Sequence, residues 1–175
     1  QIIKTFNTST GFPTNNVRDL EIDSFGNLWA TSPMGLISIA GSSVEVYDED
    51  DGFISNDMWN VEIDNNNTIW VAGEEFLSSM NNKIVRNYQR TNDTARFHGY
   101  NAGLLPLPSG DVLHGGQDLK ILKSNKNGHT LSQVISTNTW INGIETNSKG
   151  DIYYSDVVNG IIKYENGKKI LTYNN

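Results

Sequence analysis

The sequence predicts an all-β fold built from repeats. The tetrapeptide Gly-Asn-Leu-Trp at 26–29 returns in related form at 67–70, 110–113 and 150–153, so that the final residues stand 41, 43 and 40 positions apart. Sixteen glycines and only four prolines among 175 residues suit many short strands joined by tight turns. A period near forty with strand-like content is typical of propeller blades. We therefore predict a β-propeller of about four blade-like repeats, each of four antiparallel strands.

Each unit is expected to open with a β-hairpin. Residues 17–23 match residues 58–64 at an offset of 41, and both runs alternate apolar and polar residues as half-buried strands do. Both end in an acidic residue followed by a short turn of Gly or Asn, where an Asp can bond the backbone N–H groups. The next strand, at 27–31 or 68–72, follows at once, and this closes the hairpin.

Two further strands complete the expected unit. The third is predicted at 35–39, 76–80 and 160–164, and the fourth at 44–47, 84–88 and 169–173. The repeat units are placed at approximately 7–47, 48–88, 89–135 and 136–175. A blade alone cannot bury both of its faces, so we expect Trp29 and Trp70 to pack between neighbouring units.

The third unit departs most from the repeat. The segment at 104–110 carries two prolines in place of the acidic turn, and these would weaken a central strand. We interpret it as a drifted blade.

The termini predict a segment of a larger propeller. Residues 3–6 match the fourth strand at 44–47, so a fourth strand is expected at both ends of the chain. A closed ring would need that strand only once. An autonomous four-bladed ring is the alternative.

Composition excludes several classes of function. The net charge is −7 with a pI near 4.8, and no Lys/Arg cluster provides the footprint of a nucleic-acid-binding protein. The absence of cysteine excludes disulfides, thiolate catalysis and thiolate metal sites. No apolar run approaches the ~20 residues that span a bilayer, so this segment is not expected to insert into a membrane.

The repeat resembles a known family. Residues 11–17 read Gly-Phe-Pro-Thr-Asn-Asn-Val, and residues 23–31 read Asp-Ser-Phe-Gly-Asn-Leu-Trp-Ala-Thr. This is similar to the two-component regulator propeller repeat, clearly in the first two units, fairly in the fourth and weakly in the third. The resemblance implies a periplasmic or extracellular sensor portion of a bacterial hybrid histidine kinase, of a kind common in Bacteroidetes. Such sensors usually recognise oligosaccharides, and the same repeats occur in secretion-associated and surface proteins.

Candidate binding residues lie on one predicted face. Loops that enter the inner strand and loops that join the second and third strands emerge on the same side of a blade, here called the loop face. Trp59 and Trp140 lie outside the repeating Trp position and would suit stacking on sugar rings, with Arg18, Asn60 and Asn142 as hydrogen-bonding partners. The alternative is that both tryptophans pack against a neighbouring blade.

No catalytic or metal-binding motif stands out. His98, His114 and His129 are the only histidines, and none belongs to a zinc-binding pair. The acidic run at 48–51 lacks the alternating ligands of a calcium loop. We therefore expect no enzyme activity, no catalytic residue, no metal and no cofactor.

The sequence leaves three hypotheses open. The first is a non-catalytic sensing or interaction module that recognises oligosaccharide and contributes to signal transduction. The second is a lyase or hydrolase of the streptogramin-lyase type, with His114 as a general base. The third is a secretion- or surface-associated scaffold that contacts neighbouring blades or domains of its parent chain. In the third case, open edge strands at 2–6 or 170–173 could pair two copies as a homodimer.

Overall fold

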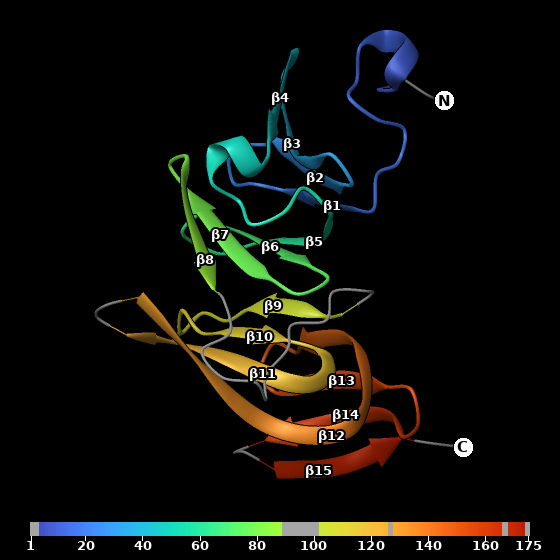
Figure 1. The fold of residues 1–175 in the computed structure, drawn as a ribbon. Helices are drawn as coiled ribbons and strands as arrows, with labels where there is room; N and C mark the ends of the chain where they lie inside the picture. The colour runs from blue at the N-terminus through green and yellow to red at the C-terminus, as the bar shows by residue number, and fades with distance from the viewer. Residues whose placement is uncertain (1–3, 89–101, 126–127, 166–167, 174–175) are drawn as a thin grey trace.

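The computed structural model describes residues 4–88, 102–125, 128–165 and 168–173, which form successive antiparallel sheets (Figure 1). The first sheet has the order β1-β2-β3-β4 and the second β5-β6-β7-β8. Their strands are β1 (Asp19–Ile22), β2 (Leu28–Ser32), β3 (Gly35–Ala40), β4 (Ser43–Tyr47), β5 (Met58–Ile63), β6 (Ile69–Gly73), β7 (Leu77–Asn81) and β8 (Ile84–Tyr88). The predicted four-stranded unit is therefore confirmed in both.

The third and fourth units share one sheet of seven strands, in the order β15-β14-β13-β12-β11-β10-β9. The 19-residue strand β12 joins them, because it pairs with β11 from Gly128 to Ile141, with a register shift after Ser136, and with β13 from Ile141 onward. The strands are β9 (Leu104–Pro106), β10 (Val112–His114), β11 (Gly116–Asn125), β12 (Gly128–Thr146), β13 (Ile152–Asp156), β14 (Gly160–Glu165) and β15 (Lys168–Tyr173).

The inner strand of the third unit is short. β9 holds only three residues and ends at Pro106. Proline has no N–H to donate to a ladder, so the strand does not continue through the Leu-Pro segment that replaces the acidic turn. The hairpin of β9 and β10 nevertheless keeps the register of the repeat, because Leu113 lies opposite Leu105 as Trp29 lies opposite Glu21 and Trp70 opposite Glu62.

The strand predicted at residues 3–6 requires a correction. Residues 1–3 lie outside the described part of the chain, and residues 4–6 are not in a strand. No described strand lies beside them to complete a ladder, so their backbone gains nothing from the extended pairing that the sequence suggested. Phe6 instead packs against Phe12, with 6.0 Å between the ring centroids, and Lys4 Nζ lies 4.4 Å from the centre of the Phe6 ring.

A repeated loop leads into the inner strand of each of the first two units. Each loop begins with a 3-10 turn, η1 (Thr8–Thr10) or η2 (Glu49–Asp51), and Gly11 or Gly52 ends it with φ of 86° or 103°. The following residue, Phe12 or Phe53, is buried. The Gly-Phe pair in the sequence thus marks a left-handed turn that delivers an aromatic ring to the core.

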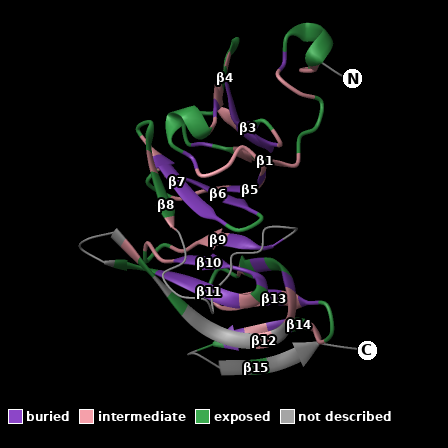
Figure 2. Cartoon of the chain, viewed as in Figure 1, coloured by how far each residue is buried: buried purple, intermediate pink, exposed green. Residues whose placement is uncertain are grey.

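Neighbouring units pack through the predicted tryptophans. Trp29 and Tyr47 join a cluster with Met58 and Val71 of the second unit, whereas Trp70 joins Leu104, Val112 and Leu122 of the third. Buried residues fill the second and third strands of the first two units, while the fourth strands face solvent on alternate positions (Figure 2). The expectation that Trp29 and Trp70 lie between units is confirmed.

The acidic residue before each hairpin turn is tied to that tryptophan. Asp23 Oδ1 accepts hydrogen bonds from the N–H groups of Phe25 and Asn27, both at 2.9 Å. Its Oδ2 accepts from Asn27 Nδ2 at 2.9 Å and from Trp29 Nε1 at 3.0 Å. Burial acts to raise the pKa of the Asp23 carboxyl, but these hydrogen bonds outweigh it and hold the pKa below its usual value. Asp64 repeats the arrangement in the second unit, with Trp70 Nε1 at 3.2 Å.

The outer face of the first unit is open. Val61 on β5 is 1% exposed because it packs in the cluster that the first unit covers. Leu20, one repeat earlier on β1, is 54% exposed, and Ile22 is 62% exposed. The sheets of the first and last units lie at opposite ends of the molecule (Figure 1). Within the described residues, no helix has the length and apolar character of a membrane span.

Replacing Asp23 by Ala should lower the free energy of unfolding by about 2 kcal/mol, because four donors lose a buried acceptor at once. The measurement is chemical denaturation at pH 7. Asp50→Ala is the matched control, since Asp50 is exposed in η2, and it should change the value by less than about 0.5 kcal/mol. Equal losses in the two variants would contradict the role given to Asp23.

Candidate functional site

Arg18 forms the centre of a compact cluster on the loop face. It directly precedes β1, and its backbone N–H donates to Thr31 O of β2 at 3.0 Å. Its guanidinium carbon lies 3.8 Å from the centre of the Trp59 ring. Nη2 pairs with Asp57 Oδ1 at 2.7 Å, and Nη1 donates to Met58 O at 2.9 Å. A stacked and bidentate guanidinium has little freedom to move, so this arginine links the first unit to the second.

Asp57 completes the cluster. Its second oxygen, Oδ2, accepts from Trp59 Nε1 at 3.3 Å, so one carboxylate holds both the cation and the indole. Across the same junction, Thr31 Oγ1 donates to Trp59 O at 3.0 Å. Three contacts therefore hold Trp59: Arg18 covers one face of its ring, Asp57 accepts from its indole N–H, and Thr31 donates to its backbone oxygen.

Two of the five predicted site residues, Arg18 and Trp59, are in contact. Asn60 is the residue after Trp59 on β5. The buried oxygen Oδ1 of Asn60 accepts no hydrogen bond from any described residue. Trp140 and Asn142 lie on β12, and β9 stands between β5 and β12 in the order of contacting inner strands. Trp140 is half-buried and Asn142 is exposed.

A cavity of about 480 Å³ adjoins this cluster. It is lined by Ile54, Ser55, Asp57, Glu74, Glu75 and Phe76, from the loop that enters β5 and the loop that joins β6 to β7. These are the two kinds of loop that the sequence placed on the loop face. Three carboxylates give the cavity an acidic lining.

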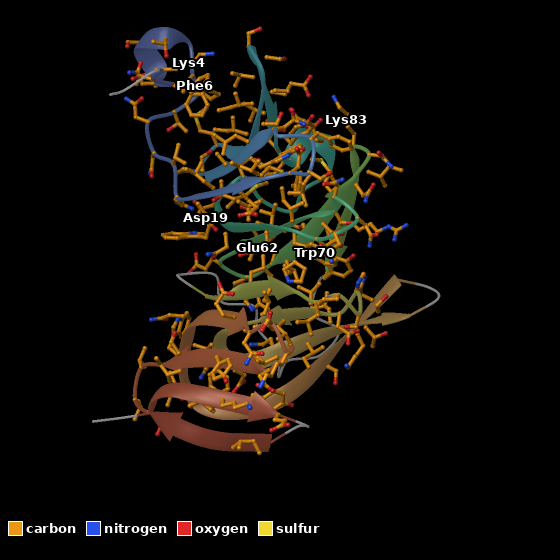
Figure 3. All side chains as sticks on the ribbon, turned by 180° about the vertical axis from the view of Figure 1, so that it is seen from behind. Lys4, Phe6, Asp19, Glu62, Trp70 and Lys83 are labelled. Atoms are coloured by element: carbon orange, nitrogen blue, oxygen red, sulfur yellow. The ribbon has the colours of Figure 1, made fainter. Side chains whose placement is uncertain are left out.

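Carboxylates also gather along the inner strands. Burial raises the pKa of the Glu62 carboxyl to about 7, with further contributions from the negative charges of Glu21, Asp19 and Glu145. Asp19 is itself engaged, because its Oδ2 accepts from Val61 N at 3.0 Å. Figure 3 labels Asp19 and Glu62, which lie on the contacting inner strands β1 and β5. The sequence analysis did not single out this group, although Glu21 and Glu62 occupy the same position of the repeat.

A second cavity lies between the second and third units, on the side of the Asp-capped turns, here called the turn face. Its volume is about 380 Å³. Its lining includes Trp70, Arg86 and Tyr88 of the second unit and His129 of the third. The Trp70 and Tyr88 rings stack at 5.5 Å, and His129 meets both edge-on at 5.0 and 5.5 Å. Sequence reasoning missed this groove because β12 departs from the repeat at the point that supplies His129.

The histidines are not gathered in one place. His114 is fully buried on β10, whereas His129 lies in the groove on the turn face. His98 falls outside the described residues. Among the residues that the structure describes, no group of three or more His, Asp or Glu side chains is arranged to hold a metal ion.

Solved structures with the same architecture include extracellular domains of two-component systems and a lyase. The extracellular domain of a protein described as a hybrid two-component system of B. thetaiotaomicron aligns with a TM-score of 0.73 and 17% identity, over 91% of this chain and 23% of its own. A second such domain from that organism aligns with a TM-score of 0.74 and 18% identity, over 96% of this chain and 22% of its own. Virginiamycin B lyase from Staphylococcus aureus aligns with a TM-score of 0.71 and 13% identity, over 90% of this chain and 55% of its own.

The chain has the β-propeller fold. At these identities the likeness concerns the fold alone, and the predicted fold class is confirmed. The four units are accordingly called blades one to four. Neither a protein-family model nor a curated protein matches this sequence. The chain spans less than a quarter of each sensor domain and about half of the lyase.

The raised pKa of Glu62 predicts that stability depends on pH. Between its ordinary value of 4.5 and about 7, the folded chain holds a proton that the unfolded chain has released. The free energy of unfolding should therefore fall as pH rises through this window, by on the order of 1–2 kcal/mol once solvent screening is allowed for. Denaturation at a series of pH values measures this slope.

Glu62→Gln should flatten that slope and be the more stable protein at pH 7, because the amide cannot ionise among the neighbouring carboxylates. Asp50→Asn, at an exposed carboxyl of η2, is the control and should keep the slope. A Glu62→Gln profile that parallels the unmodified protein would show that another group is responsible.

Proposed function

We propose that this chain is a non-catalytic ligand-binding portion of an extracytoplasmic sensor of a two-component regulator, and that it recognises a neutral oligosaccharide at the loop face. The observation that carries the proposal is the fixed Arg18–Asp57–Trp59 cluster beside a cavity of about 480 Å³. The resemblance of the repeat to sensor propellers and the two sensor domains among the similar folds support the cellular role.

The lining of the cavity favours a ligand rich in hydroxyl groups. The carboxylates of Asp57, Glu74 and Glu75 can each accept hydrogen bonds from hydroxyls, and the Ser55 hydroxyl can donate or accept. The same negative charges disfavour an anionic ligand. A neutral saccharide meets both conditions.

Trp59 supplies the aromatic surface of the proposed site. Arg18 covers one face of the ring, and the indole is tied to the cavity through Asp57, which accepts its N–H and lines the cavity. The cluster around Arg18 serves as a support, because it fixes the orientation of the indole before any ligand arrives. Asp57 is held by Arg18 and by Trp59 Nε1, and we assign it a positioning role.

A second candidate function is supported by the open face of blade one. Leu20 and Ile22 are exposed there on β1, and Phe25 and Met34 are exposed in the turns that follow β1 and β2. Apolar groups in such number favour contact with a neighbouring blade or domain of the parent chain, or with a second copy of this chain. This alternative makes the chain an interaction module.

The alternative predicts that the chain self-associates as its concentration rises, and that Ile22→Lys reduces this association by placing a charge on the apolar face. Light scattering coupled to size-exclusion chromatography measures it. Val157→Lys, at an exposed apolar residue after β13, provides the control. A monomer at every concentration would count against the second copy as partner.

The sensor proposal is tested by a thermal-shift and calorimetry screen of the purified chain against neutral oligosaccharides. A ligand present at a hundred times its Kd should stabilise the folded chain by about 2.7 kcal/mol. Trp59→Ala should abolish the binding of any hit, whereas Phe25→Ala removes an exposed aromatic elsewhere and should leave it unchanged. Trp140→Ala reports whether blade four takes part. A hit that survives Trp59→Ala would remove the loop-face site from the proposal.

A further inference from the structure

We propose that the groove between blades two and three on the turn face is a second binding site, specific for a small hydroxylated carboxylate of the uronic-acid class. It is separate from the loop-face site and does not depend on it. The argument starts from a row of residues that occurs twice in the propeller with opposite charge.

In blade one, Trp29, Ser38 and Glu45 lie directly opposite one another on β2, β3 and β4. In blade two, Trp70, Ser79 and Arg86 occupy the same positions on β6, β7 and β8. Directly opposed residues on adjacent strands share a face of the sheet, so Glu45 and Arg86 stand on the same side as their tryptophans. That side is the one packed toward the following blade.

The charge in the first row is neutralised within the protein. Glu45 accepts a hydrogen bond from the Tyr47 hydroxyl, and Lys83 Nζ of blade two pairs with Glu45 Oε2 at 3.0 Å. Lys83 also lies 5.5 Å from the centre of the Tyr47 ring. The groove between blades one and two, which Tyr47 and Lys83 line, therefore holds a closed set of partners.

Within the described part of the chain, no side chain neutralises the charge in the second row. Arg86 is exposed and lines the cavity of about 380 Å³, and it forms no ion pair or hydrogen bond with any described residue. Asp64 also lines the cavity, but its oxygens accept from the N–H groups of Asn66, Thr68 and the Trp70 indole. In a chain of net charge −7, a cation left unpaired at a cavity marks a place for an anion.

One wall of the groove consists of side chains that are hydrogen-bonded in a row, Ser79, Tyr88 and His129. The Gly110 carbonyl can only accept, so at 3.1 Å from His129 Nε2 it places the imidazole proton on that nitrogen. His129 Nδ1 then accepts from the Tyr88 hydroxyl at 3.4 Å, and the Tyr88 oxygen accepts from Ser79 Oγ at 3.0 Å. This chain of bonds fixes one wall of the groove and leaves Arg86 as the group available for recognition.

Guanidinium chemistry and the remaining lining define the ligand. The planar fork of an arginine binds a carboxylate through two parallel hydrogen bonds. Thr68, Asn81, Asn82 and Ser124 add hydroxyls and amides that match ligand hydroxyls. A volume of about 380 Å³ lies at the small end of the range for small-molecule sites, so a single sugar-acid unit is the appropriate size.

The test is calorimetric titration of the chain with galacturonate and, in parallel, with galactose, which carries a neutral hydroxymethyl group in place of the carboxylate. Galacturonate should bind and galactose should bind at least tenfold more weakly. Arg86→Gln should weaken galacturonate binding at least tenfold. Arg86→Glu gives blade two the same acidic residue that blade one has at Glu45, and it should abolish the binding. Added salt should weaken the binding, because the contact is an exposed ion pair.

Lys83→Gln is the matched control, since it removes a cation from the neighbouring groove and should leave galacturonate binding unchanged. Trp59→Ala should also leave it unchanged, so failure of the loop-face site and failure of this one are separable. The proposal is overturned if the folded protein does not bind galacturonate, if both sugars bind equally, or if Arg86→Gln, shown folded by circular dichroism, binds as well as the unmodified chain.

Discussion

The junction between one blade and the next depends on a buried tryptophan whose indole nitrogen is held by the acidic residue of its own hairpin turn. In blade one, Asp23 caps the turn and accepts from Trp29 Nε1, so the local geometry of the turn and the packing of the interface are fixed by the same carboxylate. Without that bond, a buried indole N–H would lose its partner and the tryptophan its orientation. The contact of the Trp29 ring with Tyr47, the core shared with blade two and the groove between these two blades all depend on that orientation.

Much of the fold could be predicted from sequence because the repeat imposes the same local chemistry at each copy. The hairpins, the Asp-capped turns and the inter-blade tryptophans are determined by residues within a few positions of one another. The strand predicted at residues 3–6 failed for the opposite reason. Its apolar pattern matches that of β4, but β4 is a strand because β3 lies beside it, whereas no strand that the structure describes lies beside residues 4–6. Pairing between segments is invisible to a local pattern.

The candidate sites show the same division. Arg18 and Trp59 could be placed on one face because the topology of a blade fixes where its loops emerge. The stacking of Arg18 on Trp59 nevertheless depends on Asp57, which no pattern singled out. The groove at Arg86 requires knowledge of what pairs with Glu45 and what does not pair with Arg86. The aligned repeats contain the reversal of charge between Glu45 and Arg86. The repeats do not show that Glu45 is neutralised, because its partner Lys83 lies in the hairpin of another blade.

The long strand β12 has a consequence for how the molecule comes apart. Blades one and two are separate sheets joined by side-chain packing, so one can detach while the hydrogen-bond ladder of the other stays whole. Blades three and four have no such seam, because the backbone of β12 belongs to both ladders. Opening either blade exposes amides that the other has helped to order. The C-terminal half of the chain is thus one cooperative unit in hydrogen exchange, and the N-terminal half is a pair of units that exchange with separate protection.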